Sequence, residues 1–268
     1  MRYIMMDRYI KRATIPCLAL GVLVSIAVSC FGIDTDNSDV VDLTRPLEPG
    51  LSSFVLETVV DDGTPGDVPK RRLVFTYEPG LIGTTVLVSP RRWVEDGEIL
   101  DDVAASSLIM PVLVIDATDL AGENGDFALD AGTLMRYETF AGEIPEGTAV
   151  LVALRSGAAG TGPENDASLT AAYPGLAPDA VTFLVEKRHV SLIGIDSPGI
   201  DPSGRGENEA AMILAKSGGL ALVNLKGIDS LPSRGGVLVV SPLAIHGADA
   251  APARALVLVP KVSKPPVE

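Results

Sequence analysis

The sequence contains few of the residues that most often build redox and metal sites. Its 268 residues include only two cysteines and two histidines. Both cysteines, Cys17 and Cys30, lie near the N-terminus, so the long remainder of the chain has no cysteine for a disulfide. Imidazole chemistry could come only from His189 or His246. We expect both on the surface, because His189 ends a predicted helix and His246 follows an apolar run.

Positive charge is also scarce. The chain has 21 Lys and Arg against 35 Asp and Glu, which gives a formal net charge of −14. Residues 1–33 are net positive, so the acidic excess lies in the body of the protein. An acidic body repels phosphate backbones, and nucleic acid is therefore not an expected partner. A chain of this length with 47% hydrophobic residues can bury one sizeable core.

Residues 1–33 have the layout of an export signal or an anchor. A basic segment ending in Lys11-Arg12 precedes residues 13–33, which carry no charge. The run is also long enough for a helix of roughly 20 residues to span a bilayer. It contains Ala27-Val28-Ser29-Cys30, which resembles a bacterial lipobox with Cys30 as the lipidated residue. Lipidation, simple cleavage and an uncleaved anchor remain alternatives, and each predicts export to the cell envelope or attachment to a membrane.

The remainder divides into an acidic tether at 34–39, one domain at 40–262 and a short tail at 263–268. Short apolar runs such as Met110–Asp116 are typical of strands buried on both faces. Strands alternate with helices along the domain, which predicts a mixed α/β fold with a barrel-like sheet and a few covering helices. Strands are expected at 110–116, 149–155, 190–196, 220–225 and within 237–259, and helices at 131–140, 178–188 and 207–216.

The central stretch is Leu81–Trp93, which reads Leu-Ile-Gly-Thr-Thr-Val-Leu-Val-Ser-Pro-Arg-Arg-Trp. Its β-forming residues predict a strand, and Pro90 ends that strand because proline has no N–H to donate. A second block, Tyr173–Asp201, combines Pro-Gly-Leu-Ala-Pro-Asp, a helix, and a strand ending in Gly-Ile-Asp-Ser-Pro-Gly-Ile-Asp.

These two blocks, together with the closing residues 241–255, resemble the cyclase family, which includes kynurenine formamidase and isatin hydrolase. The resemblance runs in order over about residues 40–260 and implies the swivelling β/β/α fold of that family. It also implies a divalent metal held by His, Asp and Glu, with a metal-bound water attacking an amide. The family's ligand positions fall here on Leu81, Thr85, Leu87, Arg92, Ala211 and Val223.

None of those six residues is a good metal ligand, so no metal or other cofactor is expected. The first hypothesis is an exported cyclase-family relative that is non-catalytic or has an altered activity, and whose former pocket binds a small anion or a protein partner. Thr85, Arg91, Arg92 and Ser197 would form that pocket, since paired guanidinium groups suit carboxylates. The alternative for the two arginines is a solvated turn.

The second hypothesis is an active amide hydrolase of the arylformamidase type with relocated groups. Asp196 and Asp201 are its weak catalytic candidates, with Glu207 and Glu209 nearby and Ser197 as a weak nucleophile. It would require zinc or manganese. A purely structural role is a third class, and the resemblance also allows a homodimer.

Overall fold

The structure is a computed structural model that describes residues 36–46, 54–61, 70–77, 83–155, 172–203 and 208–261. The signal or anchor at 1–33 with Cys30, the tail at 263–268 and position Leu81 lie outside these residues. Within the described ranges, no helix is long and apolar enough to cross a membrane. Ser38 and Asp39, which were predicted to belong to the tether, form the start of strand β1 (Ser38–Asp42).

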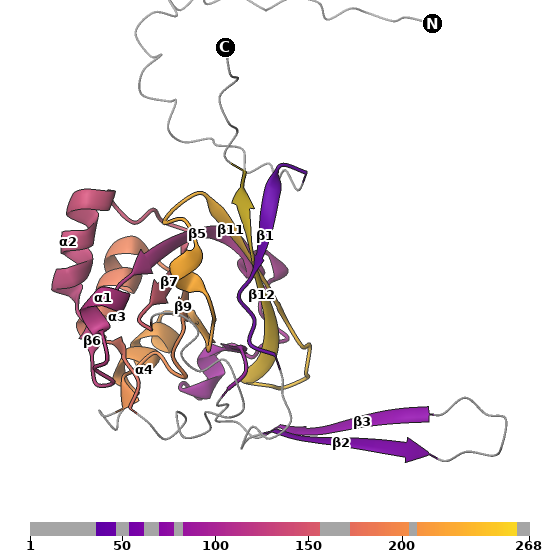
Figure 1. The fold of residues 1–268 in the computed structure, drawn as a ribbon. Helices are drawn as coiled ribbons and strands as arrows, with labels where there is room; N and C mark the ends of the chain where they lie inside the picture. Colours follow the sequence, from indigo (N-terminus) through magenta and orange to yellow (C-terminus); the bar gives the residue numbers. More distant parts are fainter. Residues whose placement is uncertain are drawn as a thin grey trace, which may run out of the picture. The chain divides into compact units, whose positions relative to one another are not determined.

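The described chain contains a closed barrel of seven strands (Figure 1). Strands β5, β7, β9 and β10 are parallel neighbours, and β4 pairs with both β10 and β12 to close the ring. The predicted mixed α/β fold with a barrel-like sheet is therefore confirmed. In spatial order the strands are β12 (Ala250–Pro260), β11 (Gly236–Pro242), β5 (Ile109–Asp116), β7 (Ala149–Ala153), β9 (Leu192–Ile195), β10 (Leu220–Val223) and β4 (Val86–Val88).

Strand β7 shows why the parallel strands are continuous apolar runs. All five of its residues are buried. Alternate side chains of a strand point to opposite faces, so Leu151 points into the barrel and Val152 points outward. Because both faces are covered, neither set can be polar. The interior cluster includes Leu87, Val112, Val114, Leu151, Leu192 and Leu222.

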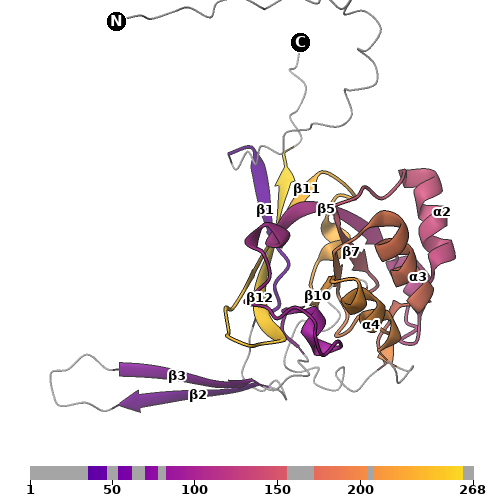
Figure 2. The same ribbon diagram turned by 180° about the vertical axis from the view of Figure 1, so that it is seen from behind.

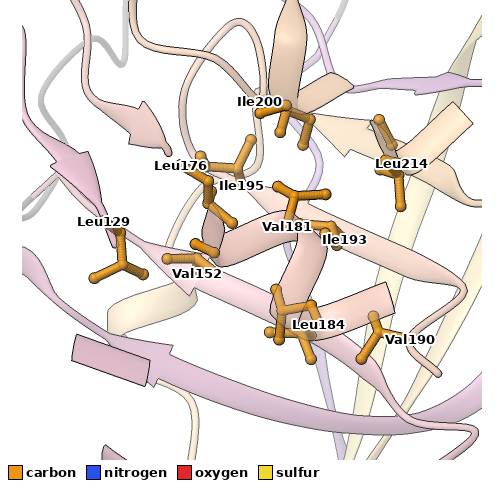
Figure 3. Packing of buried hydrophobic residues seen from close by; sticks show 14 of the residues in the cluster. Leu129, Val152, Leu176, Val181, Leu184, Val190, Ile193, Ile195, Ile200 and Leu214 are labelled. Carbon is orange, nitrogen blue, oxygen red and sulfur yellow. The ribbon is translucent and has the colours of Figure 1, made fainter. Parts of the chain in front are cut away.

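Helices cover the outer face of the parallel strands (Figures 1 and 2). Val181 and Leu184 lie over Ile193 and Val152 of the sheet (Figure 3). Pro178 occupies the first turn of α3, where its missing N–H costs no hydrogen bond. The outer cluster also contains Leu134 and Leu214. The covering elements are α2 (Ala131–Ala141), α3 (Pro178–Thr182) with its π-helical continuation η4 (Phe183–Lys187), and α4 (Glu209–Lys216).

The remaining elements are short or peripheral to the barrel. Strand β1 pairs with β12, and β2 (Phe54–Asp61) pairs with β3 (Lys70–Tyr77) in a two-stranded sheet. The helix predicted at 207–216 begins at Glu209, and no strand was predicted at β2. The other elements are η1 (Pro90–Arg92), η2 (Ala105–Leu108), α1 (Thr118–Ala121), β6 (Ala128–Leu129), β8 (Gly175–Leu176) and η6 (Ile228–Ser230).

Gly175 in β8 is expected to tolerate no side chain. A Cβ there would lie 2.5 Å from the carbonyl oxygen of Ile200 and 2.5 Å from the nitrogen of Pro202, and these backbone atoms cannot rotate away. Gly175→Ala should lower the free energy of unfolding by about 1–3 kcal/mol. Gly132→Ala is the matched control. Its Cβ would be no closer than 3.5 Å to any neighbour, and alanine favours the helix by up to about 1 kcal/mol. Urea titration measures both, and equal effects would refute the steric argument.

Candidate functional site

Buried polar side chains gather where the parallel strands β7, β9 and β10 end. Ligand sites of α/β sheets commonly lie outside the carboxyl ends of parallel strands. Thr84 and Thr85 join them because β4 is antiparallel to β10 and begins where β10 ends. We call the following seven residues the polar cluster: Arg45, Thr84, Thr85, Arg155, Asp196, Ser197 and Asn224.

Asp196 follows β9 directly and is only 5% exposed. Its carboxylate accepts the backbone N–H of Leu154 at 3.1 Å and that of Arg155 at 2.9 Å, at the end of β7. Burial raises the pKa of Asp196 to about 6, although these hydrogen bonds and the Arg155 guanidinium act in the opposite direction. A carboxyl group with this pKa can exchange a proton near neutral pH.

The guanidinium groups of Arg45 and Arg155 interact electrostatically with that carboxylate. Burial and the neighbouring positive charge of Arg155 lower the pKa of Arg45, while the charge of Asp196 raises it. The Nε of Arg45 donates to the carbonyl oxygen of Leu225 at 3.4 Å, which holds the side chain at the end of β10. The site therefore combines two positive charges with one carboxylate.

A network of hydrogen bonds places Arg45 beside the barrel. The Thr85 hydroxyl accepts the backbone N–H of Arg45 at 2.8 Å and donates to the carbonyl oxygen of Asn224 at 2.9 Å. The Thr84 hydroxyl donates to the carbonyl oxygen of Arg45 at 3.0 Å. Asn224 has φ +58, a left-handed conformation that asparagine tolerates better than most residues. Both hydrogen-bonding roles of the Thr85 hydroxyl are thus used within the protein.

Ser197 is fully buried, and its Oγ has no hydrogen-bond partner among the described residues. Its carbonyl oxygen accepts the N–H of Asn224 at 2.9 Å. An unsatisfied buried hydroxyl is costly, so a group that can bond to it gains free energy by doing so. Neither histidine is among the residues that surround it in the polar cluster, so a Ser–His pair has no support here.

Asp201, the second catalytic candidate, serves a different purpose. Its two carboxylate oxygens accept the backbone N–H groups of Ala210 at 2.7 Å and Ala211 at 2.9 Å, at the start of α4. This is the stabilising position for an anion at a helix N-terminus. Burial raises the pKa of Asp201, and these hydrogen bonds oppose that rise. Asp201 therefore holds α4 and is separate from the polar cluster. Glu209 lies exposed in the first turn of α4, and Glu207 is outside the described residues.

The structure divides the predicted pocket of Thr85, Arg91, Arg92 and Ser197 between the two ends of β4. Thr85 precedes this strand, whereas η1 with both arginines follows it. Arg92 pairs with Asp249 at 3.3 Å, and Arg91 is exposed. The arginines that accompany Asp196 are Arg45 and Arg155 instead.

The family's ligand positions also do not converge on one centre. Leu87 lies opposite Leu222 in the interior cluster, whereas Val223 lies opposite Val86 on the outer face. Ala211 belongs to the outer cluster on α4. These side chains have no donor atom, and the described residues contain no group of three or more His, Cys, Asp or Glu that could hold a metal. The residues present do not fit a divalent metal at the family position.

Both histidines lie on the surface, as expected. His246 is 96% exposed, and its Nδ1 is 2.7 Å from a carboxylate oxygen of Asp101. His189 is exposed in a left-handed conformation just after η4. Neither can serve as a base for the polar cluster.

The closed mixed barrel with one helical layer defines an α/β protein. Its polar cluster lies at the carboxyl ends of the parallel strands and is a candidate ligand-binding site. The profile of the Cyclase family matches residues 41–202. The chain therefore belongs to the cyclase family.

Isatin hydrolase of Roseibium aggregatum is 31% identical over 260 residues, which cover 87% of this chain and 92% of that protein. A kynurenine formamidase of Bacillus cereus is 27% identical over 226 residues, which cover 82% of this chain and 97% of that protein. A solved isatin hydrolase bound to the product analogue thioisatinate has a TM-score of 0.74 and 25% identity, covering 85% of this chain and 94% of that chain. The predicted family and its fold are confirmed.

Sequence reasoning missed four residues of the polar cluster, namely Arg45, Thr84, Arg155 and Asn224. Arg45 follows the Asp-Leu-Thr of the opening block, and Arg155 follows a buried apolar strand. A charged residue directly after a parallel strand is a usable signal, because such strand ends share one edge of the sheet. The partnership of Arg45 with that edge depends on contacts across 180 residues of sequence, as in its bond to Leu225.

The ionisation of Asp196 should make stability depend on pH. A carboxyl group whose pKa is raised from 3.8 to about 6 stabilises the fold when protonated, and that contribution is lost as pH rises through about 6. The loss should approach about 3 kcal/mol, at 1.36 kcal/mol per pKa unit. Asp196→Asn cannot ionise, so the difference in unfolding free energy between the variant and the natural protein should change over this window. Urea titrations from about pH 4 to about pH 8 measure it. A constant difference would contradict the assignment.

Proposed function

We propose that this cyclase-family protein binds a small organic anion at the polar cluster and does not carry out metal-dependent hydrolysis. The observation that carries the proposal is the position of Arg45 and Arg155 at the strand ends, where Arg45 donates to the carbonyl oxygen of Leu225 and the backbone of Arg155 donates to Asp196. Guanidinium groups at the ends of parallel strands attract an anion.

The chemistry of guanidinium favours a carboxylate as that anion. A planar guanidinium presents paired N–H donors that match the two oxygens of a carboxylate. The buried Ser197 hydroxyl would offer a further hydrogen bond. The side chains of Leu87, Ala211 and Val223 are apolar and cannot coordinate a metal ion. They therefore support binding of an anion in preference to a metal.

The proposed setting is the cell envelope. The basic and apolar segment at 1–33 would direct export, and Cys30 would be lipidated if the signal is of the lipoprotein type. The acidic body is consistent with a small-molecule or protein partner and not with nucleic acid. We include a homodimer in this proposal, and here only the analogy with the family supports it.

An amide hydrolase of the arylformamidase type is the second candidate, and Asp196 favours it. A buried carboxyl group with a pKa of about 6 has the property of a general base. It lies next to Ser197 in the chain, and two relatives are named isatin hydrolase and kynurenine formamidase. With the family ligand positions unfit for a metal, any zinc or manganese would have to use relocated carboxylates.

Removal of Arg155 tests the anion site. Arg155→Ala keeps the backbone N–H that Asp196 accepts but removes one guanidinium, so benzoate should bind about 10–100-fold more weakly. Arg91→Ala is the matched control, because Arg91 is exposed at the other end of β4. Isothermal titration calorimetry measures both affinities. Weaker binding in Arg91→Ala with unchanged binding in Arg155→Ala would place the anion at the turn after β4 and refute the polar cluster.

Metal content separates the two candidate functions. After exposure to zinc and to manganese followed by dialysis, the full chain should retain neither metal above background in elemental analysis. It should also leave N-formylkynurenine intact, since no metal-bound water is available to attack the formamide. A stoichiometric metal with formamide cleavage that disappears in Asp196→Asn would instead establish the hydrolase.

A further inference from the structure

The outer face of the barrel is apolar on the side away from the helices. The α-helices lie over the parallel strands, and among the described residues no α-helix lies over β1, β11 and β12 (Figures 1 and 2). Val40 is 60% exposed and Ile109 is 49% exposed, and four apolar residues between them are half-buried. We call these six residues the open face: Val40, Ile109, Val237, Val239, Leu256 and Leu258.

The strand register joins the open face into one surface. It forms two neighbouring rows across the sheet, Val40–Leu258–Val237 and Leu256–Val239–Ile109. The residues between the rows, such as Leu238 and Val257, belong to the interior cluster. An antiparallel sheet with one solvated face normally has polar residues on that face. The open face departs from this pattern, and a contiguous exposed apolar surface marks an interaction site.

The charges beside the open face balance each other. Strands β1 and β12, with the residue that follows β12, contribute two aspartates and two basic residues, and β11 contributes no charge. Arg254 pairs with Asp42 at 2.6 Å, and Lys261 lies 3.9 Å from Asp39. The chain as a whole has a net charge of −14, so two copies repel each other over most of their surface but not on this side. A surface that docks on a lipid bilayer would instead carry an excess of basic residues.

The edge of the same sheet is protected against pairing. Among the described strands, β1 lies at the end of the sheet and pairs with β12 alone. Two of its five residues are Asp39 and Asp42. Charged residues on an edge strand oppose the addition of a strand from another chain. Contact through this sheet would therefore use its face.

We propose that the open face is the contact surface between two copies of this chain. This inference goes beyond the anion site and assigns a surface to the homodimer included in the proposed function. In a two-fold dimer the same surface meets itself, so the apolar rows form the centre and the Arg254–Asp42 pair lies at the rim.

The size of the open face predicts a reversible dimer. Neighbouring strands lie about 4.8 Å apart, so the open face extends about 14 Å across its four strands. A standard interface buries roughly 800 Å² on each partner, so the polar residues around the open face must supply much of that area. The dimer should therefore form as the protein concentration rises from about 1 to about 100 μM.

The experiment is sedimentation equilibrium of the full chain over that concentration range. Val40→Lys and Ile109→Lys should each raise the dissociation constant of the dimer at least about tenfold, because an ammonium group would be buried against apolar surface. Phe140→Lys is the matched control. Phe140 is 90% exposed near the end of α2, so the same change there should leave the dimer intact. Urea titration of each variant checks that it remains folded.

Hydrogen exchange at low and high protein concentration locates the contact without any variant. The amides of β1 should exchange more slowly in the dimer, because contact between copies opposes the local opening of this edge strand. Exchange in α2 should not depend on concentration.

Each other outcome is decisive. A monomer at every concentration would overturn this proposal and the homodimer, and would leave the anion site intact. A dimer that Phe140→Lys weakens as much as Val40→Lys does, or that neither variant of the open face weakens, would place the contact elsewhere. Weaker binding of Val40→Lys to phosphatidylcholine vesicles, with unchanged self-association, would assign the open face to lipid. A dimeric protein that fails to bind benzoate would overturn the anion site alone.

Discussion

The bonds from the N–H groups of Leu154 and Arg155 to the Asp196 carboxylate join the ends of β7 and β9 at the point where the site forms. The carboxylate belongs to the residue after β9 and accepts hydrogen bonds from the backbone at the end of β7. The structure of the barrel rim and the chemistry of the site therefore depend on the same group. A buried charge is costly unless it is hydrogen-bonded and close to an opposite charge, and Asp196 has both. This constraint explains why its pKa is raised only to about 6.

Around that carboxylate, the polar cluster brings together charged and hydrogen-bonding side chains from distant segments of the chain. Guanidinium groups from two distant parts of the chain supply positive charge there. Thr85 uses both hydrogen bonds of its hydroxyl to hold Arg45 and Asn224 together. Thr85 therefore has a positioning role in this structure.

The fold was largely predictable, because apolar runs such as β5 and β7 are buried on both faces and Pro90 ends β4. The site was only partly predictable. Asp196, Ser197 and Thr85 were recognised from motifs, and the structure brings them together. Arg91 and Arg92 were placed in the pocket because they follow the central strand in sequence. The antiparallel direction of β4 puts them at its other end, which no local pattern reveals.

The sequence by itself determined the family, the order of strands and helices, and the absence of donor atoms at several positions that the resemblance assigns to metal ligands. These properties follow from residue type and periodicity, which are local. Only the tertiary structure decided which charges share a site, because Arg45, Arg155 and Asp196 are brought to one rim by strand pairing and by hydrogen bonds that span 180 and 41 residues of sequence. Closure of the barrel brings those strand ends to one rim, and burial there sets the pKa of Asp196.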